Sequence, residues 1–183
     1  MIDRITDLSN QILKLYEELN QIQKTFPSCN GCKECCNTPS CNIEATILEF
    51  IPLAVHFSQM NLLDKWLDKL ERTTEEDICV LFDPANPKGG CTYHIFRPLI
   101  CRLFSASLVI RKNIIQPLSC KYLRSSLINQ ITNLPNAQDY FSKLLSIDFF
   151  LASYRYPINT ALKKALEYVG LYYTTGRFTR RSA

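Results

Sequence analysis

The segment from residue 28 to residue 42 reads SCNGCKECCNTPSCN and contains five cysteines. It offers little apolar surface that could pack into a core, so another interaction has to hold it in place. Two thiolates separated by two residues can turn toward one ion, and Asn30-Gly31 supplies a residue suited to the turn between them. We therefore expect a loop held by bound metal, with a C-x2-C-x2-C-C motif formed by Cys29, Cys32, Cys35 and Cys36.

Further cysteines follow this loop in a second region of the chain. Disulfides give no account of them in a reducing compartment, and the role of a buried free thiol as a small hydrophobe explains single residues better than a cluster. We predict that thiolates from both regions bind metal and join the two regions together. Cys41 and His94 stay open as additional ligands, because an isolated histidine is more often a hydrogen-bonding residue. The predicted ligands are Cys29, Cys32, Cys35, Cys36, Cys79, Cys91, Cys101 and Cys120.

The spacing of the first cysteines bears on the metal. Zinc is commonly bound by two C-x2-C pairs, whereas a C-x2-C-x2-C run is typical of bacterial ferredoxins. Here the next cysteine does not follow at the ferredoxin spacing, so the ferredoxin fold is not predicted. The pattern favours an iron-sulfur cluster, of the four-iron type, over Zn²⁺.

Two arginines and a tyrosine near the second region are candidates for binding a non-metal group. Four thiolates around Zn²⁺ or a four-iron cluster leave a charge of about −2, which nearby cations would compensate. Arg97 and Arg102 suit this role, and the same guanidinium groups could instead bind a carboxylate or phosphate of a substrate or pair with surface acids. Tyr93 is the third candidate for binding a substrate or cofactor.

Helical periodicity dominates the rest of the chain. From Ile5 to Phe26, apolar residues recur at steps of three and four, which predicts a helix packed on the core, with a short coiled coil as the alternative. A strand is expected over 77–82, and a hairpin over 106–115 that turns near Lys112 and Asn113. The other predicted helices cover 43–57, with a bend or restart near Pro52, and 61–71, 123–131, 137–151 and 158–169.

These elements predict a mainly α fold with a small β-hairpin element. A chain of 183 residues with a hydrophobic fraction of 46% suits one compact helical domain. We expect a single domain over 1–183 that is stapled by the cysteine-ligated metal site. Its parts are an N-terminal helix (1–27), a cysteine-cluster metal-binding core (28–120) and C-terminal helices (121–183).

Composition and charge exclude several classes of protein. The formal net charge of +4 is spread along the chain, so no nucleic-acid partner is expected. The N-terminus lacks the pattern of an export signal, and no apolar run reaches the length of a membrane span, so we expect a soluble cytoplasmic protein. No catalytic triad, carboxylate pair or phosphate-binding loop stands out, which disfavours hydrolase and kinase chemistry.

The ordered cysteine motifs resemble a known family. The C-x2-C-x2-C-C run is followed by Cys79-Val80-Leu81-Phe82, by Cys91-Thr92-Tyr93-His94, and by RPLICRLF over residues 97–104. Together they are similar to the YkgJ-type cysteine-cluster family, and the resemblance covers Cys29 to Cys120. It implies a zinc- or iron-chelating domain. Because the family includes flagellin lysine N-methylases, the resemblance also implies an iron-sulfur cluster used with S-adenosylmethionine.

Three functions remain open from the sequence. The first is a metal-binding module, with iron-sulfur ahead of zinc, that has a redox or metal-dependent role. The second is an enzyme that modifies a protein substrate, such as a lysine N-methylase, which predicts a cavity beside the metal. The third is a zinc-stabilised interaction module that recruits a protein partner through the N-terminal helix, which predicts a closed site and a separable helix.

Overall fold

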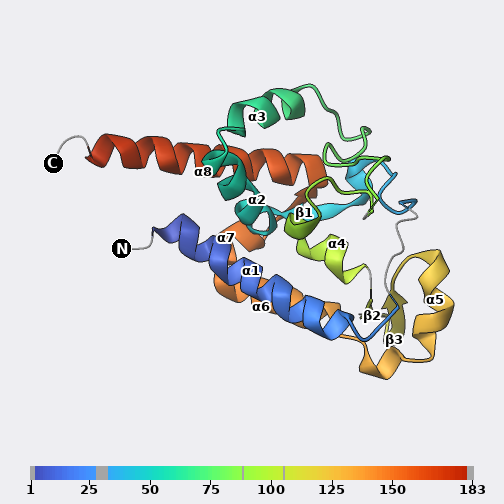
Figure 1. Ribbon diagram of the computed structural model, residues 1–183. Coiled ribbons are helices and arrows are strands. Elements are labelled where there is room, and N and C mark those ends of the chain that lie inside the picture. The colour runs from blue at the N-terminus through green and yellow to red at the C-terminus, as the bar shows by residue number, and fades with distance from the viewer. Residues whose placement is uncertain (1–2, 28–32, 88, 105, 181–183) are drawn as a thin grey trace.

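The computed structural model describes residues 3–27, 33–87, 89–104 and 106–180. Its described part is mainly helical and carries two small antiparallel sheets (Figure 1). The helices are α1 (Arg4–Gln23), α2 (Ile47–Gln59), α3 (Leu63–Glu71), α4 (Leu99–Leu103), α5 (Lys121–Ile128), α6 (Ala137–Ile147), α7 (Phe149–Ala152) and α8 (Ile158–Arg180). The strands are β1 (Glu44–Thr46), β2 (Ser107–Arg111), β3 (Ile114–Leu118) and β4 (Arg155–Pro157), and short 3-10 turns are η1 (Ser40–Asn42), η2 (His94–Phe96) and η3 (Ile131–Asn133).

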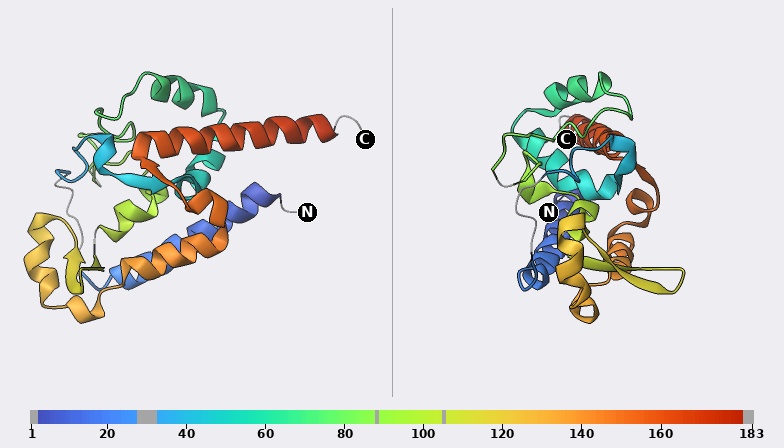
Figure 2. Two further views of the ribbon diagram at one scale, coloured as in Figure 1. Left: turned by 180° about the vertical axis from the view of Figure 1, so that it is seen from behind. Right: turned by 90° about the vertical axis from the view of Figure 1, so that its right-hand side faces the viewer.

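The N-terminal helix forms as its periodicity predicts. Asp3 caps α1 by accepting a hydrogen bond from the Thr6 amide at 2.9 Å. The apolar stripe is buried along most of its length, with Ile5, Ile12 and Leu19 inaccessible to solvent. This stripe packs against α2 and α6, and Figure 2 shows α1 and α6 lying side by side. The predicted packing on the core is confirmed.

The central helix α2 crosses the core between α1 and α8. A capping box starts it: Thr46 accepts from the Glu49 amide, and the Glu49 carboxylate accepts from the Thr46 amide at 2.6 Å. The helix continues through Pro52, so of the two alternatives predicted there, a bend or a restart, the restart is wrong. The loss of one backbone hydrogen bond at Pro52 is tolerated because most of this helix, including Pro52 and its neighbours in the chain, is buried.

The two sheets differ in how far the sequence anticipated them. The predicted hairpin is present as β2 and β3, and its turn residues Lys112 and Asn113 both adopt positive φ, 50° and 62°. The second pair joins β1 to β4, with Ala45 opposite Tyr156, and was not predicted. The strand expected over 77–82 is replaced by isolated bridges, Pro39 with Ile78 and Phe82 with Cys91.

The C-terminal part follows the predicted helices with one interruption. Asp148 has an extended backbone and separates α6 from α7, where its carboxylate accepts from the Leu151 amide at 3.0 Å. The same carboxylate pairs with Arg4 at 2.6 Å, which joins this corner to the start of α1.

Among the described helices, none combines the length and the apolar content that crossing a bilayer requires.

Candidate metal centre

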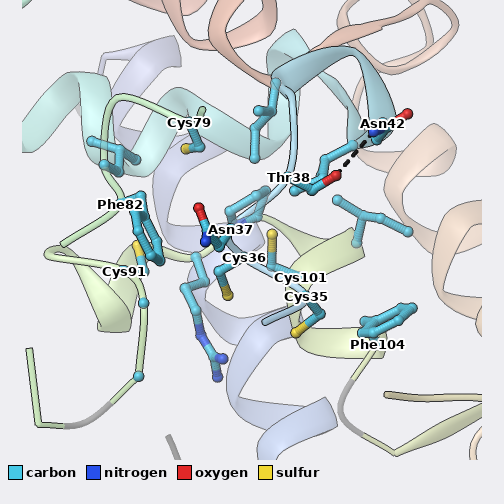
Figure 3. A pocket seen from close by; sticks show the side chains of 18 of the residues that line it. Cys35, Cys36, Asn37, Thr38, Asn42, Cys79, Phe82, Cys91, Cys101 and Phe104 are labelled. Carbon is cyan, nitrogen blue, oxygen red and sulfur yellow. Dashed lines mark hydrogen bonds between the residues drawn. The ribbon is translucent and has the colours of Figure 1, made fainter. Parts of the chain in front are cut away.

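A cavity of about 1000 Å³ lies where the cysteine loop, the segment 79–104, the β2–β3 hairpin and β4 meet. Its thiols come from three stretches of the chain: the cysteine loop, the segment that carries Cys79 and Cys91, and α4, which carries Cys101. Figure 3 shows that Cys79 and Cys91 lie on one side and Cys35, Cys36 and Cys101 lie nearer its middle. The cysteines that line the cavity are Cys35, Cys36, Cys41, Cys79, Cys91 and Cys101.

Backbone hydrogen bonds fix the loop that carries the first group of thiols. Lys33 has a positive φ of 61°, and the amide of Cys36 donates to its carbonyl at 2.9 Å, so the chain turns tightly before Cys36. Farther along, the Ser40 amide donates to the Asp77 carbonyl at 2.8 Å. The Cys41 amide donates to the Glu75 carbonyl at 3.0 Å. The loop is therefore attached to the segment that leads to the second group.

Cys79 and Cys91 are held by a short ladder and by one buried side chain. The amide of Thr92 donates to the Leu81 carbonyl at 2.8 Å, so the two backbone segments that carry Cys79 and Cys91 lie side by side. Asn159, at the start of α8, accepts from the Val80 amide at 2.9 Å and donates to the Ile78 carbonyl at 3.2 Å. The position of Cys79 thus depends on a residue far away in the sequence.

Gly90 allows the two groups to approach each other. A Cβ atom at this position would lie 2.7 Å from the Cβ of Cys36 and 2.9 Å from the ring of Phe82. Such contacts are shorter than van der Waals distances allow. Because only glycine avoids this clash, the loop of Cys36 can pack directly against the backbone before Cys91.

Cys101 lies on α4, whose first turn is held by a buried carboxylate. The amide of Ile100 donates to Glu49 Oε1 at 3.0 Å, while the other oxygen of Glu49 caps α2. Burial raises the pKa of Glu49, and hydrogen bonds from the amides of Thr46 and Ile100 partly offset that effect. One side chain therefore joins the N-termini of two helices, and Cys101 is carried by one of them.

Electrostatics divides the thiols into two groups. The hydrogen bond with Cys35, the Gly90 amide and Arg97 together lower the pKa of Cys36 to about 6. Burial, in contrast, raises the pKa of Cys79 to about 12 and raises that of Cys91 and Cys101 as well. The negative charge of neighbouring thiolates raises the pKa of each of these three thiols further. The thiols are close enough to interact, and deprotonating all of them would require a compensating cation.

Arg97 supplies positive charge within the cavity. It lines the cavity and lowers the pKa of Cys36, Cys91 and Cys101. Its Nε atom is buried and has no hydrogen-bond partner among the described residues. A buried cationic donor beside several thiols suits a site that holds an anionic thiolate-metal group.

Arg102 and Tyr93 lie elsewhere. Arg102 is buried over the ring of Tyr16 at 4.4 Å and donates to the carbonyls of Arg97 and Ile95 and to Asn20 Oδ1. Tyr93 packs edge-on against Phe57 and Trp66. Neither side chain lines the cavity, so their role in binding a substrate or cofactor stays a prediction. The charge of Arg102 lowers the pKa of Cys91, which agrees with the cationic role predicted for it.

The remaining predicted residues have different outcomes. His94 and Cys41 line the cavity, so both stay open as ligands. Cys120 is buried at the N-cap of α5 and does not line the cavity. Cys29 and Cys32 lie outside the described residues, so their role as ligands stays a prediction.

The donor set suits a soft metal. Thiolate ligands favour zinc and iron-sulfur clusters over hard cations such as Mg²⁺ or Ca²⁺. Within the described ranges, no three histidine, cysteine, aspartate or glutamate side chains are arranged to hold one metal ion. The thiols are instead distributed along the walls of the cavity (Figure 3).

Two residues that support the site were not predicted from the sequence. The pattern Thr46-x-x-Glu49 before an apolar run is typical of a capping box, so the N-cap of α2 could have been predicted. No sequence pattern indicates the hydrogen bond between Glu49 and the Ile100 amide. Asn159 has no comparable sequence pattern. Both residues act on the cysteines through contacts with backbone far away in the sequence.

Comparison with known proteins agrees with this site. Residues 28–126, more than half of the chain, match the CxxCxxCC family, described as "Putative zinc- or iron-chelating domain". No curated protein and no solved structure matches the chain. The matched segment contains all nine cysteines of the chain. The chain therefore belongs to the CxxCxxCC family of zinc- or iron-chelating domains.

Proposed function

We propose that the protein binds an iron-sulfur cluster in the cavity and uses it in a redox or metal-dependent reaction. The observation that carries this proposal is the convergence of six thiols, from three stretches of chain, on one cavity. The proposed ligands come from this group, with Cys29 and Cys32 added from the same loop. Membership of a zinc- or iron-chelating family supports metal binding in general.

The number and spread of the thiols favour a cluster over a single zinc ion. A structural zinc site needs four ligands around one point, whereas the thiols here exceed four and are spread over a large cavity. A polynuclear cluster takes thiolates at several irons and so suits a distributed donor set.

The cavity also supports an enzymatic role as second candidate. A volume of about 1000 Å³ is at the upper end of the range of roughly 300 to 1000 Å³ that small-molecule sites occupy. A substrate could therefore lie beside the metal. We do not extend the proposal to S-adenosylmethionine, since no feature of the described residues identifies a site for it.

The interaction-module alternative loses its main support. It required the apolar stripe of the N-terminal helix to be available to a partner. In the structure, Ile5, Ile12 and Leu19 are fully buried in the core of the protein's own fold. A partner could reach them only if α1 left the domain.

The proposal is tested by the visible spectrum and by iron, sulfide and zinc analysis of protein purified without oxygen. We expect absorption near roughly 400 nm with stoichiometric sulfide. Cys36→Ser, Cys91→Ser and Cys101→Ser should each lower bound iron. Cys120→Ser is the matched control, because serine is a favourable N-cap residue and Cys120 does not line the cavity. Colourless protein with stoichiometric zinc would refute the cluster.

A further inference from the structure

The thiols and Arg97 account for only part of the cavity. Figure 3 shows Phe104 and Asn42 on the opposite side from Cys79 and Cys91. β4 lies beside η1, which contains Asn42, and the β2–β3 hairpin follows shortly after Phe104 in the chain. We call this second part the apolar end. Its lining side chains are Phe104, Ile43, which follows Asn42 in the chain, and Leu118, which pairs with Ser107 shortly after Phe104.

Two arginines line the cavity from the elements around the apolar end. Arg111 is at the tip of β2, and Arg155 is at the start of β4. Both are exposed to solvent, and neither forms an ion pair with a described carboxylate. The guanidinium of Arg155 lies over the ring of Phe141 at 3.9 Å, a contact that positions the group without neutralising its charge.

The carboxylates that line the cavity do not pair with these arginines. Of the two carboxylates that line the cavity, Glu34 is already paired with Lys121 at 2.8 Å, and Glu44 is exposed on β1. Arg155 acts at longer range on the buried Glu49 carboxylate and lowers its pKa, but no described carboxylate lies within ion-pair distance of either arginine. Both guanidinium groups can therefore bind a ligand from solution.

We propose that Arg111 and Arg155 bind the carboxylate or phosphate group of a small organic anion whose apolar part lies against the apolar end of the cavity. Guanidinium groups suit both anions because their planar fork matches the oxygens in a bidentate arrangement. The adjoining apolar side chains select an anion that also carries a hydrophobic group. This inference goes beyond the metal centre and does not depend on which metal is bound.

Titration calorimetry with defined probes tests the subsite. Phenylacetate and phenyl phosphate each combine an anionic group with an apolar ring, inorganic phosphate lacks the ring, and 2-phenylethanol lacks the charge. We expect at least one of the aromatic anions to bind about tenfold or more tightly than both controls. Equal affinity for inorganic phosphate would show an electrostatic surface without the apolar contact and would overturn the proposal.

Variants locate the binding on the two arginines. Arg111→Gln and Arg155→Gln should each weaken binding of the aromatic anion about tenfold, while Arg72→Gln, at the exposed end of α3, should leave it unchanged. If Arg155→Gln unfolds the protein, Arg111→Gln on the exposed hairpin still decides the outcome. Unchanged affinity in the folded variants, or no binding of any aromatic anion, would overturn the proposal.

Metal analysis of the same samples separates this proposal from the previous one. Protein that binds the aromatic anion but contains no iron would refute the iron-sulfur proposal and leave the anion subsite standing. Protein with a full complement of iron and sulfide that fails to bind any aromatic anion would refute the subsite alone.

Discussion

Replacing Glu49 with alanine is expected to destabilise the fold and to lower metal binding together. The carboxylate accepts from the amide of Thr46 at 2.6 Å and from the amide of Ile100 at 3.0 Å. The first bond caps α2, and the second fixes the turn that carries Cys101. Alanine would leave both amides in place without an acceptor.

The size of the effect follows from these two amides. A buried donor that loses its acceptor costs about 1–3 kcal/mol, so two of them cost about 2–6 kcal/mol. Removing a buried carboxylate also removes its desolvation penalty, which offsets part of this cost. We expect Glu49→Ala to lower the free energy of unfolding by about 3 kcal/mol. Glu49→Gln retains one acceptor oxygen and should lose about half as much.

The pH dependence provides a second readout. Burial raises the pKa of Glu49, so the folded state binds this proton more tightly than the unfolded state does. The associated stabilisation is complete below the ordinary pKa and is lost as pH rises through the raised value. The wild type should therefore lose more stability than Glu49→Gln over this pH range, and the difference between them should shrink toward neutral pH.

Urea denaturation, followed by circular dichroism across this pH range, measures both effects, and iron analysis measures the coupling to the site. Glu76→Ala is the matched control, because Glu76 is exposed in the loop that follows α3. A loss below about 1 kcal/mol in Glu49→Ala, together with unchanged metal content, would refute the assignment of Glu49 as the link between the two helices.

Three further substitutions probe the support of the site. Gly90→Ala should lower metal content, because its Cβ would collide with Cys36, and metal analysis of the folded variant checks this. Asn159→Ala should destabilise the fold by about 1–3 kcal/mol and lower metal binding, because it removes the hydrogen bonds to Ile78 and Val80 on either side of Cys79. Normal metal content at normal stability would contradict this prediction. Arg102→Lys should destabilise the fold by a similar amount in urea denaturation, because lysine cannot reproduce the three-way hydrogen bonding of the guanidinium, and an unchanged denaturation midpoint would argue against the packing role.

Much of the helical structure could be predicted because it depends on local patterns. The stripe from Ile5 onward repeats with the helical period, and the hairpin turn at Lys112 and Asn113 contains an asparagine, which tolerates positive φ. The strand predicted over 77–82 does not form, because its residues make only isolated bridges, such as that of Phe82 with Cys91, and no continuous ladder. The pairing of β1 with β4 joins residues more than a hundred positions apart, which no local pattern reports.

The sequence by itself determined the donor chemistry of this protein: closely spaced cysteines supply the thiolates that soft metals prefer, and their order identifies the family. Only the tertiary structure decided which of these cysteines share a cavity. It brought Cys35, Cys36 and Cys41 to the wall formed by Cys79, Cys91 and Cys101, and left Cys120 outside. The physical reason is that ligand type is a property of single side chains, whereas their convergence depends on buried contacts between distant segments, such as those of Glu49 and Asn159.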